Sequence, residues 1–346
     1  MKYRHLIFGI LSVTTVSVTL PLAAQSQTPV MMAESKCSDM HTESESLSIQ
    51  IALEDFVRTH DADIGIAVIT DRGDTVCMNN GRKYPMNSVM KLYQAMAVAD
   101  VMQQRGHRLD SMITVSRKEM EEDTYSPMRD QYPKGDFRIS IADLLKYSLQ
   151  QSDNNACDIL FHHVIGISET DRYIRNLGIS GFAISASEAD MHADTARVYE
   201  NWNYPIAAAI LINRLFTEPV FDSDQKGNEN CENEHDNIGI GRRYDNIYQC
   251  FITETLNECT TGRNRLARPL LPTNAVIGHK TGTGFPSANG HPQGINDVGF
   301  VRLPNGRSYS IAVFVKSSRY DMEETERLIA EVSEIVWREV SGEQTE

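Results

Sequence analysis

The alternation of hydrophobic and polar residues predicts β-strands near both ends of the chain. Residues 64–71 (IGIAVITD) and 75–78 form two short apolar runs, and an Arg-Gly-Asp turn separates them. Near the other end, residues 298–303 and 307–315 flank Pro-Asn-Gly at 304–306, and Asn-Gly between apolar runs is a strong hairpin signal. We therefore expect one hairpin from each end of the chain.

The pattern between these hairpins is mainly helical. Residues 139–150 are amphipathic, with apolar positions at helical spacing, and residues 205–216 form an apolar helical run. After the last strand, Asp321 and Glu324 form a capping box ahead of a final amphipathic helix. Strands at both ends with helices between them predict a mixed α/β (α+β) fold.

We expect a sheet domain of residues 40–84 and 265–346, and an inserted helical domain of residues 85–264. A cleft between two such domains is a natural site for a small ligand. The region of about residues 217–246 is expected to be a surface insertion, because residues 222–237 are acidic, rich in Asn and nearly free of apolar side chains. Metal binding by this stretch is the less favoured alternative.

Composition and net charge limit the classes of function that the protein can have. The chain has 346 residues, of which 41% are hydrophobic, and its 33 Lys and Arg residues against 47 Asp and Glu residues give a net charge of −14. That balance is typical of a soluble globular protein with a sizeable core. It excludes nucleic-acid binding through a broad basic face.

The first 24 residues have the three-part pattern of a secretory signal peptide. Lys2 and Arg4 precede an uncharged, mostly apolar run over residues 6–22, and small residues lead to a cleavage point near Ala24-Gln25. A permanent membrane anchor is the alternative, but the polar sequence after the run favours cleavage. We expect an exported protein with no membrane contact after cleavage.

Six cysteines follow this segment, and an oxidising compartment permits disulfides among them. Cys157 lies within an apparent helix and is interpreted as a buried free thiol. Cys231, Cys250 and Cys259 cluster in the sequence. One disulfide among these three is expected, and its pairing is left open.

The candidate chemistry begins with a Ser-x-x-Lys motif at Ser88 and Lys91, which a helix-like segment follows. On a helix these positions share a face, so Lys91 can reach the Ser88 hydroxyl, which needs a base to become a nucleophile. A helix N-terminus also offers free N–H groups to a developing oxyanion. The motif alone is weak, because a second copy at residues 223–226 lies in the acidic stretch, where no catalytic context exists.

Two further motifs give the first one its weight. Ser-Asp-Asn at residues 152–154 directly follows the amphipathic helix, and Lys-Thr-Gly-Thr at residues 280–283 follows an apolar run and is expected to lie on an edge strand. Alone, the first motif would be interpreted as a helix cap and the second as a solvated strand end. Three motifs in this order, each beside the appropriate element, are far harder to obtain by chance.

With these motifs the sequence resembles the serine β-lactamase and penicillin-binding-protein superfamily, and specifically a class A β-lactamase. The resemblance covers about residues 44–341. It implies an antiparallel sheet domain flanked by helices plus an all-helical domain, and hydrolysis of the β-lactam ring of antibiotics, with resistance as the consequence. It also implies a monomeric periplasmic enzyme that needs no cofactor or metal and takes a small-molecule β-lactam as its partner.

The resemblance assigns roles to the first two motifs. Ser88 is implied to be the acylated nucleophile, and Lys91 its proton-transfer partner. Ser152 would relay the proton to the leaving β-lactam nitrogen. Asn154 would hold the side-chain amide of the substrate.

The third motif is implied to bind the substrate carboxylate through Lys280, Thr281 and Thr283, because a carboxylate requires cations and hydroxyl donors. The backbone N–H groups of Ser88 and Thr283 are implied to form the oxyanion hole. The arginine that often assists carboxylate binding after Lys-Thr-Gly in the family is missing, and Ile295 lies near its register.

Glu188 is implied to activate the deacylating water. Class A enzymes carry such a glutamate in a loop after the Ser-Asp-Asn motif, and the position of Glu188, 34 residues beyond Asn154, matches the family. A positioned carboxylate is what an acyl-enzyme needs in order to be cleared by water. Asp190 is the rival carboxylate in this loop, and a solvated glutamate without a role is the alternative interpretation.

The loop departs from the family in several places. Ala189 stands where the family usually has Pro, and His192 stands in place of an Asn, whose hydrogen bond to water we expect the imidazole to take over. Ala186 and Asn201 replace the Arg and Asp that usually tie the loop ends, so we expect the loop to be held differently. Tyr125 is expected to form an aromatic wall of the cleft.

These departures resemble the extended-spectrum cephalosporinase branch found in Bacteroidetes-type bacteria, which implies a preference for cephalosporins. One alternative is a penicillin-binding protein or D,D-peptidase-like enzyme that clears its acyl-enzyme slowly, and Glu188 argues against it. A non-catalytic binding protein of the same fold is disfavoured by the retained polar site residues. A metallo-β-lactamase is disfavoured because no His-x-His-x-Asp motif occurs.

Overall fold

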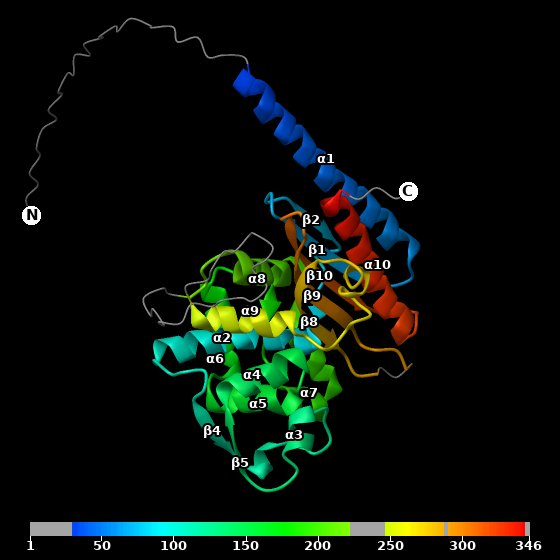
Figure 1. Cartoon of the computed structure of the whole chain (residues 1–346). Coiled ribbons are helices and arrows are strands. Elements are labelled where there is room, and N and C mark those ends of the chain that lie inside the picture. Colours follow the sequence, from blue (N-terminus) through cyan, green and yellow to red (C-terminus); the bar gives the residue numbers. More distant parts are fainter. Residues whose placement is uncertain (1–29, 222–245, 287–289, 343–346) are drawn as a thin grey trace, which may run out of the picture. The chain divides into compact units, whose positions relative to one another are not determined.

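The computed structural model describes residues 30–221, 246–286 and 290–342, with side chains from residue 45 onward. Contacts within the chain separate two units, Met1–His41 and Thr42–Glu346. The second unit contains the sheets, the site and all helices from α2 onward (Figure 1).

Five antiparallel strands form the main sheet in the order β2-β1-β10-β9-β8. β1 pairs with β10 along its whole length, so strands from the two ends of the chain lie side by side. β8 is an edge strand, as the sequence predicts for the Lys-Thr-Gly segment. The strands are β1 (Asp63–Thr70), β2 (Thr75–Met78), β8 (Val276–Thr283), β9 (Ile295–Arg302) and β10 (Ser308–Lys316).

Both predicted hairpins are confirmed. In the turn between β9 and β10, Gly306 adopts a φ of 86°, a left-handed conformation that costs glycine little, and its N–H donates to the Leu303 carbonyl at 3.0 Å. In the turn between β1 and β2, Gly73 has a φ of 88°, and its N–H donates to the Thr70 carbonyl at 3.0 Å. The turn residues therefore set the register of the strands that they join.

Residues 42–59 of α1 (Val30–Thr59) and the helix α10 (Met322–Ser341) pack against one face of the sheet. α10 begins at the predicted capping box, in which the Asp321 carboxylate accepts from the Glu324 N–H at 2.8 Å. Leu53 of α1 and Leu328 of α10 are buried in the same cluster as the strand residue Ile66. This apolar cluster fixes both helices on the sheet.

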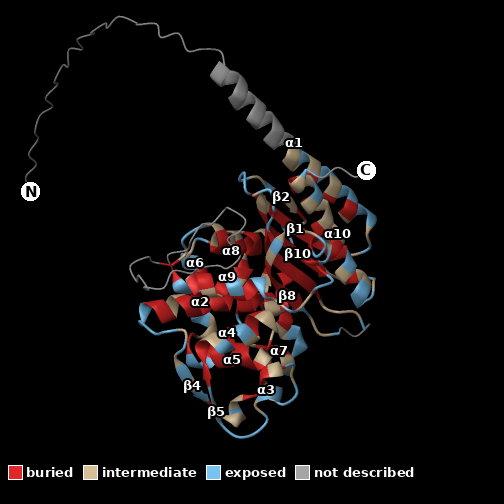
Figure 2. Ribbon diagram, viewed as in Figure 1, coloured by how far each residue is buried: buried red, intermediate tan, exposed pale blue. Residues whose placement is uncertain are grey.

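The other face of the sheet packs against the helical region. Ala67 and Phe314 point toward it, whereas their strand neighbours Ile66 and Val313 point toward α1 and α10, as the period of two requires. α8 (Pro205–Thr217) covers β1, β9 and β10 on this side. α2 (Met90–Gln104) buries 12 of its 15 residues, which is typical of a central helix surrounded by others. Figure 2 shows the buried residues concentrated along α2, α8 and the strands.

The remaining elements complete the helical region and two small sheets, ordered β3-β7-β6 and β4-β5. The helices are α3 (Pro127–Gln131), α4 (Ile141–Gln150), α5 (Asn154–His163), α6 (Ile167–Asn176), α7 (Glu188–Ala193) and α9 (Ile247–Asn257), with short 3-10 helices at Asn87–Val89, Arg117–Glu119, Thr195–Glu200 and Arg268–Leu270. The strands are β3 (Tyr84–Pro85), β4 (Met112–Val115), β5 (Phe137–Ser140), β6 (Phe182–Ala183) and β7 (Trp202–Asn203).

The helices predicted over residues 139–150 and 205–216 are confirmed as α4 and α8, except that residues 139–140 end strand β5. The division into a sheet domain and a helical domain stays a prediction. The signal segment, the second Ser-x-x-Lys motif and the acidic stretch at 222–237 lie outside the described residues. Within residues 30–221, 246–286 and 290–342, no helix combines the length and the apolar character needed to cross a membrane.

For the described cysteines, the structure shows which are free thiols and which is disulfide-bonded. Cys157 on α5 is buried and free, as predicted. Cys250 is disulfide-bonded, whereas Cys259 is a free thiol. Cys259 is therefore not a member of the expected pair, and Cys231 lies outside the described residues.

Candidate active site

Ser88 lies where the 3-10 helix Asn87–Val89 turns into α2. Asn87 adopts a left-handed φ of 48°, and its side-chain amide donates to the Gly294 carbonyl at 3.2 Å, which anchors the turn to the start of β9. Lys91 follows one helical turn after Ser88, and its Nζ lies 2.7 Å from Ser88 Oγ. The predicted contact within the Ser-x-x-Lys motif is confirmed.

The fully buried Lys91 side chain is surrounded by acceptors. Its Nζ lies 2.6 Å from Glu188 Oε1, 2.7 Å from Asn154 Oδ1 and 3.0 Å from the Ser152 carbonyl. A buried ammonium group is tolerated when it is paired and hydrogen-bonded in this way. Because Glu188 Oε1 also lies 3.4 Å from Ser88 Oγ, both ionisable groups border the candidate nucleophile.

Glu188 is placed by the N-terminus of α7. The Ser187 hydroxyl accepts from the Asp190 N–H at 3.0 Å and caps the helix. Asp158 on α5 accepts from the backbone N–H groups of Glu188 at 2.9 Å and Ala189 at 2.7 Å. Burial, together with the nearby Glu188 carboxylate, raises the pKa of Asp158 to about 7. Asp158 thus ties α7 to α5.

The ends of the loop that carries Glu188 are joined by Asn201. Its Oδ1 accepts from the N–H groups of Ser185 at 2.8 Å and Ala186 at 3.0 Å, and its Nδ2 donates to the Ala186 carbonyl at 2.8 Å. Asn201 is fully buried, so these bonds are shielded from water. One amide therefore performs the bridging for which the family uses a charged pair, which confirms that the loop is held differently.

The other two polar residues of α7 have different neighbours. Backbone hydrogen bonding from Ser187 and the Arg197 guanidinium lower the pKa of Asp190, so this rival carboxylate is engaged by the cap and by a surface ion pair. The His192 Nε2 lies 3.9 Å from the Asp123 carboxylate. Of the two carboxylates proposed from the sequence, Glu188 is the one beside Ser88.

The Ser-Asp-Asn motif forms the turn between α4 and α5. Ser152 adopts a left-handed φ of 60°, and Asp153 caps α5 by accepting from the Ala156 N–H at 2.9 Å. The Asn154 side chain accepts from Lys91 and donates to Thr124 Oγ1 at 2.9 Å. The turn thereby presents the Ser152 hydroxyl and the Asn154 amide beside Lys91.

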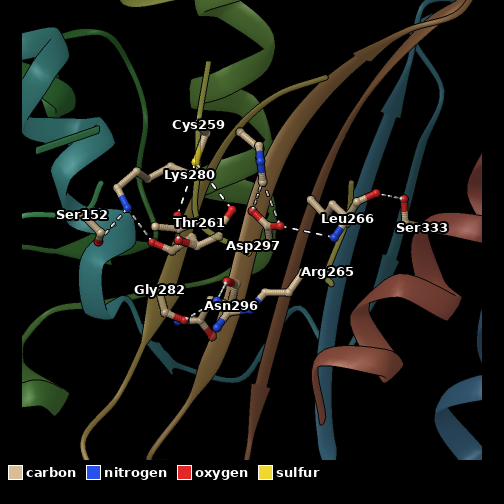
Figure 3. Close-up of polar contacts among 12 residues, drawn as sticks. Ser152, Cys259, Thr261, Arg265, Leu266, Lys280, Gly282, Asn296, Asp297 and Ser333 are labelled. Atoms are coloured by element: carbon tan, nitrogen blue, oxygen red, sulfur yellow. Dashed lines mark hydrogen bonds and ion pairs between the residues drawn. The ribbon is translucent and has the colours of Figure 1, made fainter. Parts of the chain in front are cut away.

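Lys280 projects from β8 toward this turn (Figure 3). Its fully buried Nζ lies 3.0 Å from Ser152 Oγ and 2.9 Å from the Thr281 carbonyl. Burial and repulsion from Lys91 lower the pKa of Lys280 to about 7. Lys280 therefore joins the strand side of the site to the Ser-Asp-Asn turn.

Thr281 and Thr283 continue along β8, each with a partner from the segment after α9. Thr281 Oγ1 lies 2.6 Å from Thr261 Oγ1, and Thr283 Oγ1 accepts from the Arg265 guanidinium at 2.6 Å. The Arg265 side chain is only 3% exposed and also pairs with Glu326 at 3.1 Å. A cation thus lies directly beside Thr283, the second hydroxyl-bearing residue of the motif.

Residues 48–228 and 253–340 match the family described as the beta-lactamase enzyme family. A β-lactamase of Phocaeicola vulgatus is 37% identical over 277 residues, 80% of this chain and 79% of that protein. The extended-spectrum β-lactamase PER-1 of Pseudomonas aeruginosa is 32% identical over 302 residues, 87% of this chain and 90% of that protein. The crystal structure of a class A β-lactamase from Bacteroides cellulosilyticus has a TM-score of 0.76 and 32% identity, covering 86% of this chain and 99% of that one.

The chain belongs to the class A β-lactamase family. It is a serine enzyme that hydrolyses the β-lactam ring of antibiotics, and this activity confers resistance. The resemblance stated from the three motifs is confirmed, and so is the fold that it implied.

Six of the predicted site residues form one hydrogen-bonded cluster in this β-lactamase. They are Ser88, Lys91, Ser152, Asn154, Glu188 and Lys280. Thr281 and Thr283 lie on the same strand as Lys280. Tyr125 is 58% exposed and contributes its backbone carbonyl, which accepts from the Asn154 N–H at 3.1 Å.

Two residues that contact the candidate site of this β-lactamase, Arg265 and Asp158, were not identified from the sequence. Ile295 is buried and pairs in register with Thr283, so the arginine of the usual register is indeed absent, but Arg265 reaches Thr283 from another segment. Asp158 was missed because it lies in mid-helix outside any motif. In the part of the chain that the structure describes, no group of three or more His, Cys, Asp or Glu side chains could hold a metal ion.

Proposed function

We propose that Ser88 attacks the β-lactam carbonyl and that Lys91 takes up its proton. The observation that carries this proposal is the 2.7 Å contact between Lys91 Nζ and Ser88 Oγ at the start of α2. Glu188 at 2.6 Å from the same Nζ provides a route for the proton that the ammonium already holds. The backbone N–H groups of Ser88 and Thr283 stabilise the oxyanion of the tetrahedral intermediate.

Ser152 then passes a proton to the leaving β-lactam nitrogen. Its hydroxyl is supported by Lys280 Nζ at 3.0 Å, and the Ser152 carbonyl accepts from Lys91 at 3.0 Å. These two contacts hold Ser152 through its hydroxyl and through its backbone carbonyl, one from each lysine. A hydroxyl in that position can receive a proton on one side and donate one on the other.

Glu188 directs water onto the acyl-enzyme. Its Oε1 lies 3.4 Å from Ser88 Oγ, which leaves the carboxylate next to the ester that Ser88 would form. His192, one turn along α7, provides a further hydrogen bond to this water. The alternative is a penicillin-binding protein that clears its acyl-enzyme slowly, and the placement of Glu188 favours the hydrolase.

The substrate carboxylate is bound by Lys280, Thr281 and Thr283, with Arg265 supporting Thr283. Asn154 holds the amide of the substrate side chain, and Tyr125 forms a wall of the cleft between the sheet domain and the helical domain. Cephalosporins are the preferred substrates. The relative PER-1, which is described as an extended-spectrum enzyme, supports this preference.

The enzyme acts as a monomer in the periplasm, after removal of residues 1–24 and without a cofactor. The basic and apolar pattern of those residues supports the export route. A sedimentation measurement of the mature chain would test the monomer, and N-terminal sequencing of the exported protein would test cleavage after Ala24.

The central experiment follows the intact mass of the mature protein after mixing with a limiting amount of a cephalosporin. We expect a transient adduct on Ser88 that disappears as the drug is hydrolysed, and no adduct in the Ser88→Ala variant. A persistent adduct on Ser88 would favour the penicillin-binding-protein alternative and remove Glu188 from its role. An adduct that survives in Ser88→Ala would show that the nucleophile was wrongly assigned.

A further inference from the structure

A second polar cluster lies behind the strand that carries Lys280 (Figure 3). His279 precedes Lys280 on β8, and the alternation of a strand directs it to the opposite face. The imidazole Nδ1 lies 2.9 Å and 3.0 Å from the two carboxylate oxygens of the fully buried Asp297. Asp297 Oδ2 also accepts from the Leu266 N–H at 3.2 Å, so both the carboxylate and the imidazole have a fixed orientation.

Cys259 extends this cluster toward the substrate-binding motif. Its Sγ lies 3.3 Å from Thr261 Oγ1, which in turn lies 2.6 Å from Thr281 Oγ1. A polar chain therefore connects the thiol of Cys259 to the hydroxyl of Thr281.

The segment that carries Cys259 and Thr261 is packed against β8 without spare room. A Cβ added at Gly262 would lie 2.4 Å from Thr281 Cγ2, and Gly262 has a φ of 65°, a left-handed conformation that favours glycine. Displacement of this segment would therefore be transmitted to Thr281. The polar chain and the close packing act on the same residue.

The electrostatic environment of Cys259 differs from that of the other free cysteines in the described residues. Burial raises the pKa of Cys77 and of Cys157. Burial acts on Cys259 in the same direction, but His279 and Lys280 outweigh it and lower the pKa of Cys259 to about 7. His279 itself, despite its burial, has its pKa raised to about 10 by Asp297 and Cys259, so it stays protonated at neutral pH.

We propose that Cys259 is a positioning residue for carboxylate recognition, because its sulfur anchors Thr261 against Thr281, the neighbour of Lys280 on β8. This inference rests on the proposed roles of Lys280 and Thr281. It assigns a function to a thiol that takes no part in the acyl-transfer cluster around Ser88.

The charged groups that face Lys280 come from several elements. Burial and Lys91 of α2 favour its neutral form, whereas Cys259, Asp297 of β9 and Glu188 of α7 favour its ammonium form. Cys259 Sγ is faced by His279 and Lys280, and by the backbone carbonyls of α4 at 3.9 Å and 4.0 Å. Removing the ionisable sulfur should therefore make Lys280 lose its proton at lower pH.

The test compares Cys259→Ser with Cys259→Ala, in steady-state kinetics with a cephalosporin across the pH range around neutrality. Serine retains a hydroxyl for Thr261 but does not ionise in this range, whereas alanine loses both functions. We expect the alkaline limb of kcat/KM to move to lower pH by about half a unit in both variants. Cys259→Ala alone should also raise KM about fivefold below pH 7, with kcat changed less than about twofold.

Cys77→Ser is the matched control, because Cys77 is a free thiol on β2 with no contact to this cluster. A KM of Cys259→Ala that equals the KM of this control would overturn the proposal. In the unmodified protein, thiolate absorbance in the ultraviolet should appear with a midpoint of about 7 and be lost in Cys259→Ser.

Lys280→Met, assayed in parallel, distinguishes failure of the proposed carboxylate site from failure of the proposed role of Cys259. If this variant binds the cephalosporin as tightly as the unmodified enzyme, the proposed carboxylate site is wrong. If Lys280→Met is impaired while both Cys259 variants behave like the control, only the role of Cys259 is wrong.

Discussion

Lys91 and Lys280 are both fully buried, but their partners differ. Lys91 forms an ion pair with Glu188 at 2.6 Å and also donates to the Asn154 amide oxygen at 2.7 Å. Lys280 contacts the Ser152 hydroxyl and a backbone carbonyl, and no carboxylate of the described residues lies within 4.0 Å of its Nζ. One ammonium is in direct contact with a carboxylate of the protein, and the other is not.

The difference indicates two uses of a buried cation. A lysine paired with a carboxylate can pass its proton to that carboxylate and so become a base, because the total charge of the pair is unchanged by the transfer. The ammonium of a lysine held by neutral acceptors is buried without a counter-ion in contact, so the carboxylate of a bound substrate would supply the missing negative charge. On this basis α2 provides the proton-transfer lysine and β8 the anion-binding lysine.

Lys91→Met should have the largest effect of the changes that separate the two lysines. It removes the proton acceptor and leaves Glu188 buried without its cation, and we expect acylation to slow by about 10²–10⁴-fold. Single-turnover kinetics with a chromogenic cephalosporin would measure this step. Loss of less than about tenfold would show that Lys91 is not the proton partner.

Glu188→Ala should affect the second half of the reaction. We expect Ser88 to be acylated and the adduct to persist, with deacylation slower by about 10²–10³-fold, because water is no longer activated. Time-resolved intact mass would detect the adduct. Asp190→Asn is the matched control, since Asp190 lies on the same short helix but is held by Ser187 and Arg197; rapid turnover by Glu188→Ala would identify the wrong base.

Lys280→Met should mainly impair binding. We expect KM for a cephalosporin to rise about 10–100-fold while kcat falls less, since the carboxylate loses a charge-assisted partner. The exposed residue Lys134 provides the control variant Lys134→Met. A fall in kcat with unchanged KM would contradict the assignment and would give Lys280 a role closer to that of Lys91.

The pH dependence of binding should give the smallest effect. Because the pKa of Lys280 is lowered to about 7, the ammonium form prevails below that pH and is lost above it. KM should therefore rise severalfold as the pH increases through about 7, for substrates that carry the carboxylate. A substrate ester without that charge should show no such rise, and a KM that stays flat for the free acid would contradict the prediction.

The parts of the site that depend on local geometry could be predicted from the sequence. Ser88 and Lys91 share a helical face because of their spacing, and Lys280 lies on an edge strand that alternation already indicated. Arg265 and Asp158 could not be predicted in the same way, because their roles arise where segments distant in the sequence pack together. Asn201 is an intermediate case, because the sequence shows that the usual charged pair is absent but does not show that one amide bridges the loop.

The pairing of β1 with β10 has a consequence for how the enzyme is made. Asp63 pairs with Lys316, so the sheet cannot form fully until β1, near the start of the folded unit, and β10, near its end, are both present. A nascent chain that has not yet reached β10 lacks the partner of its first strand, and contacts of such long sequence separation form slowly. Biosynthesis therefore delivers a polypeptide whose main sheet cannot close until its last hairpin has been made.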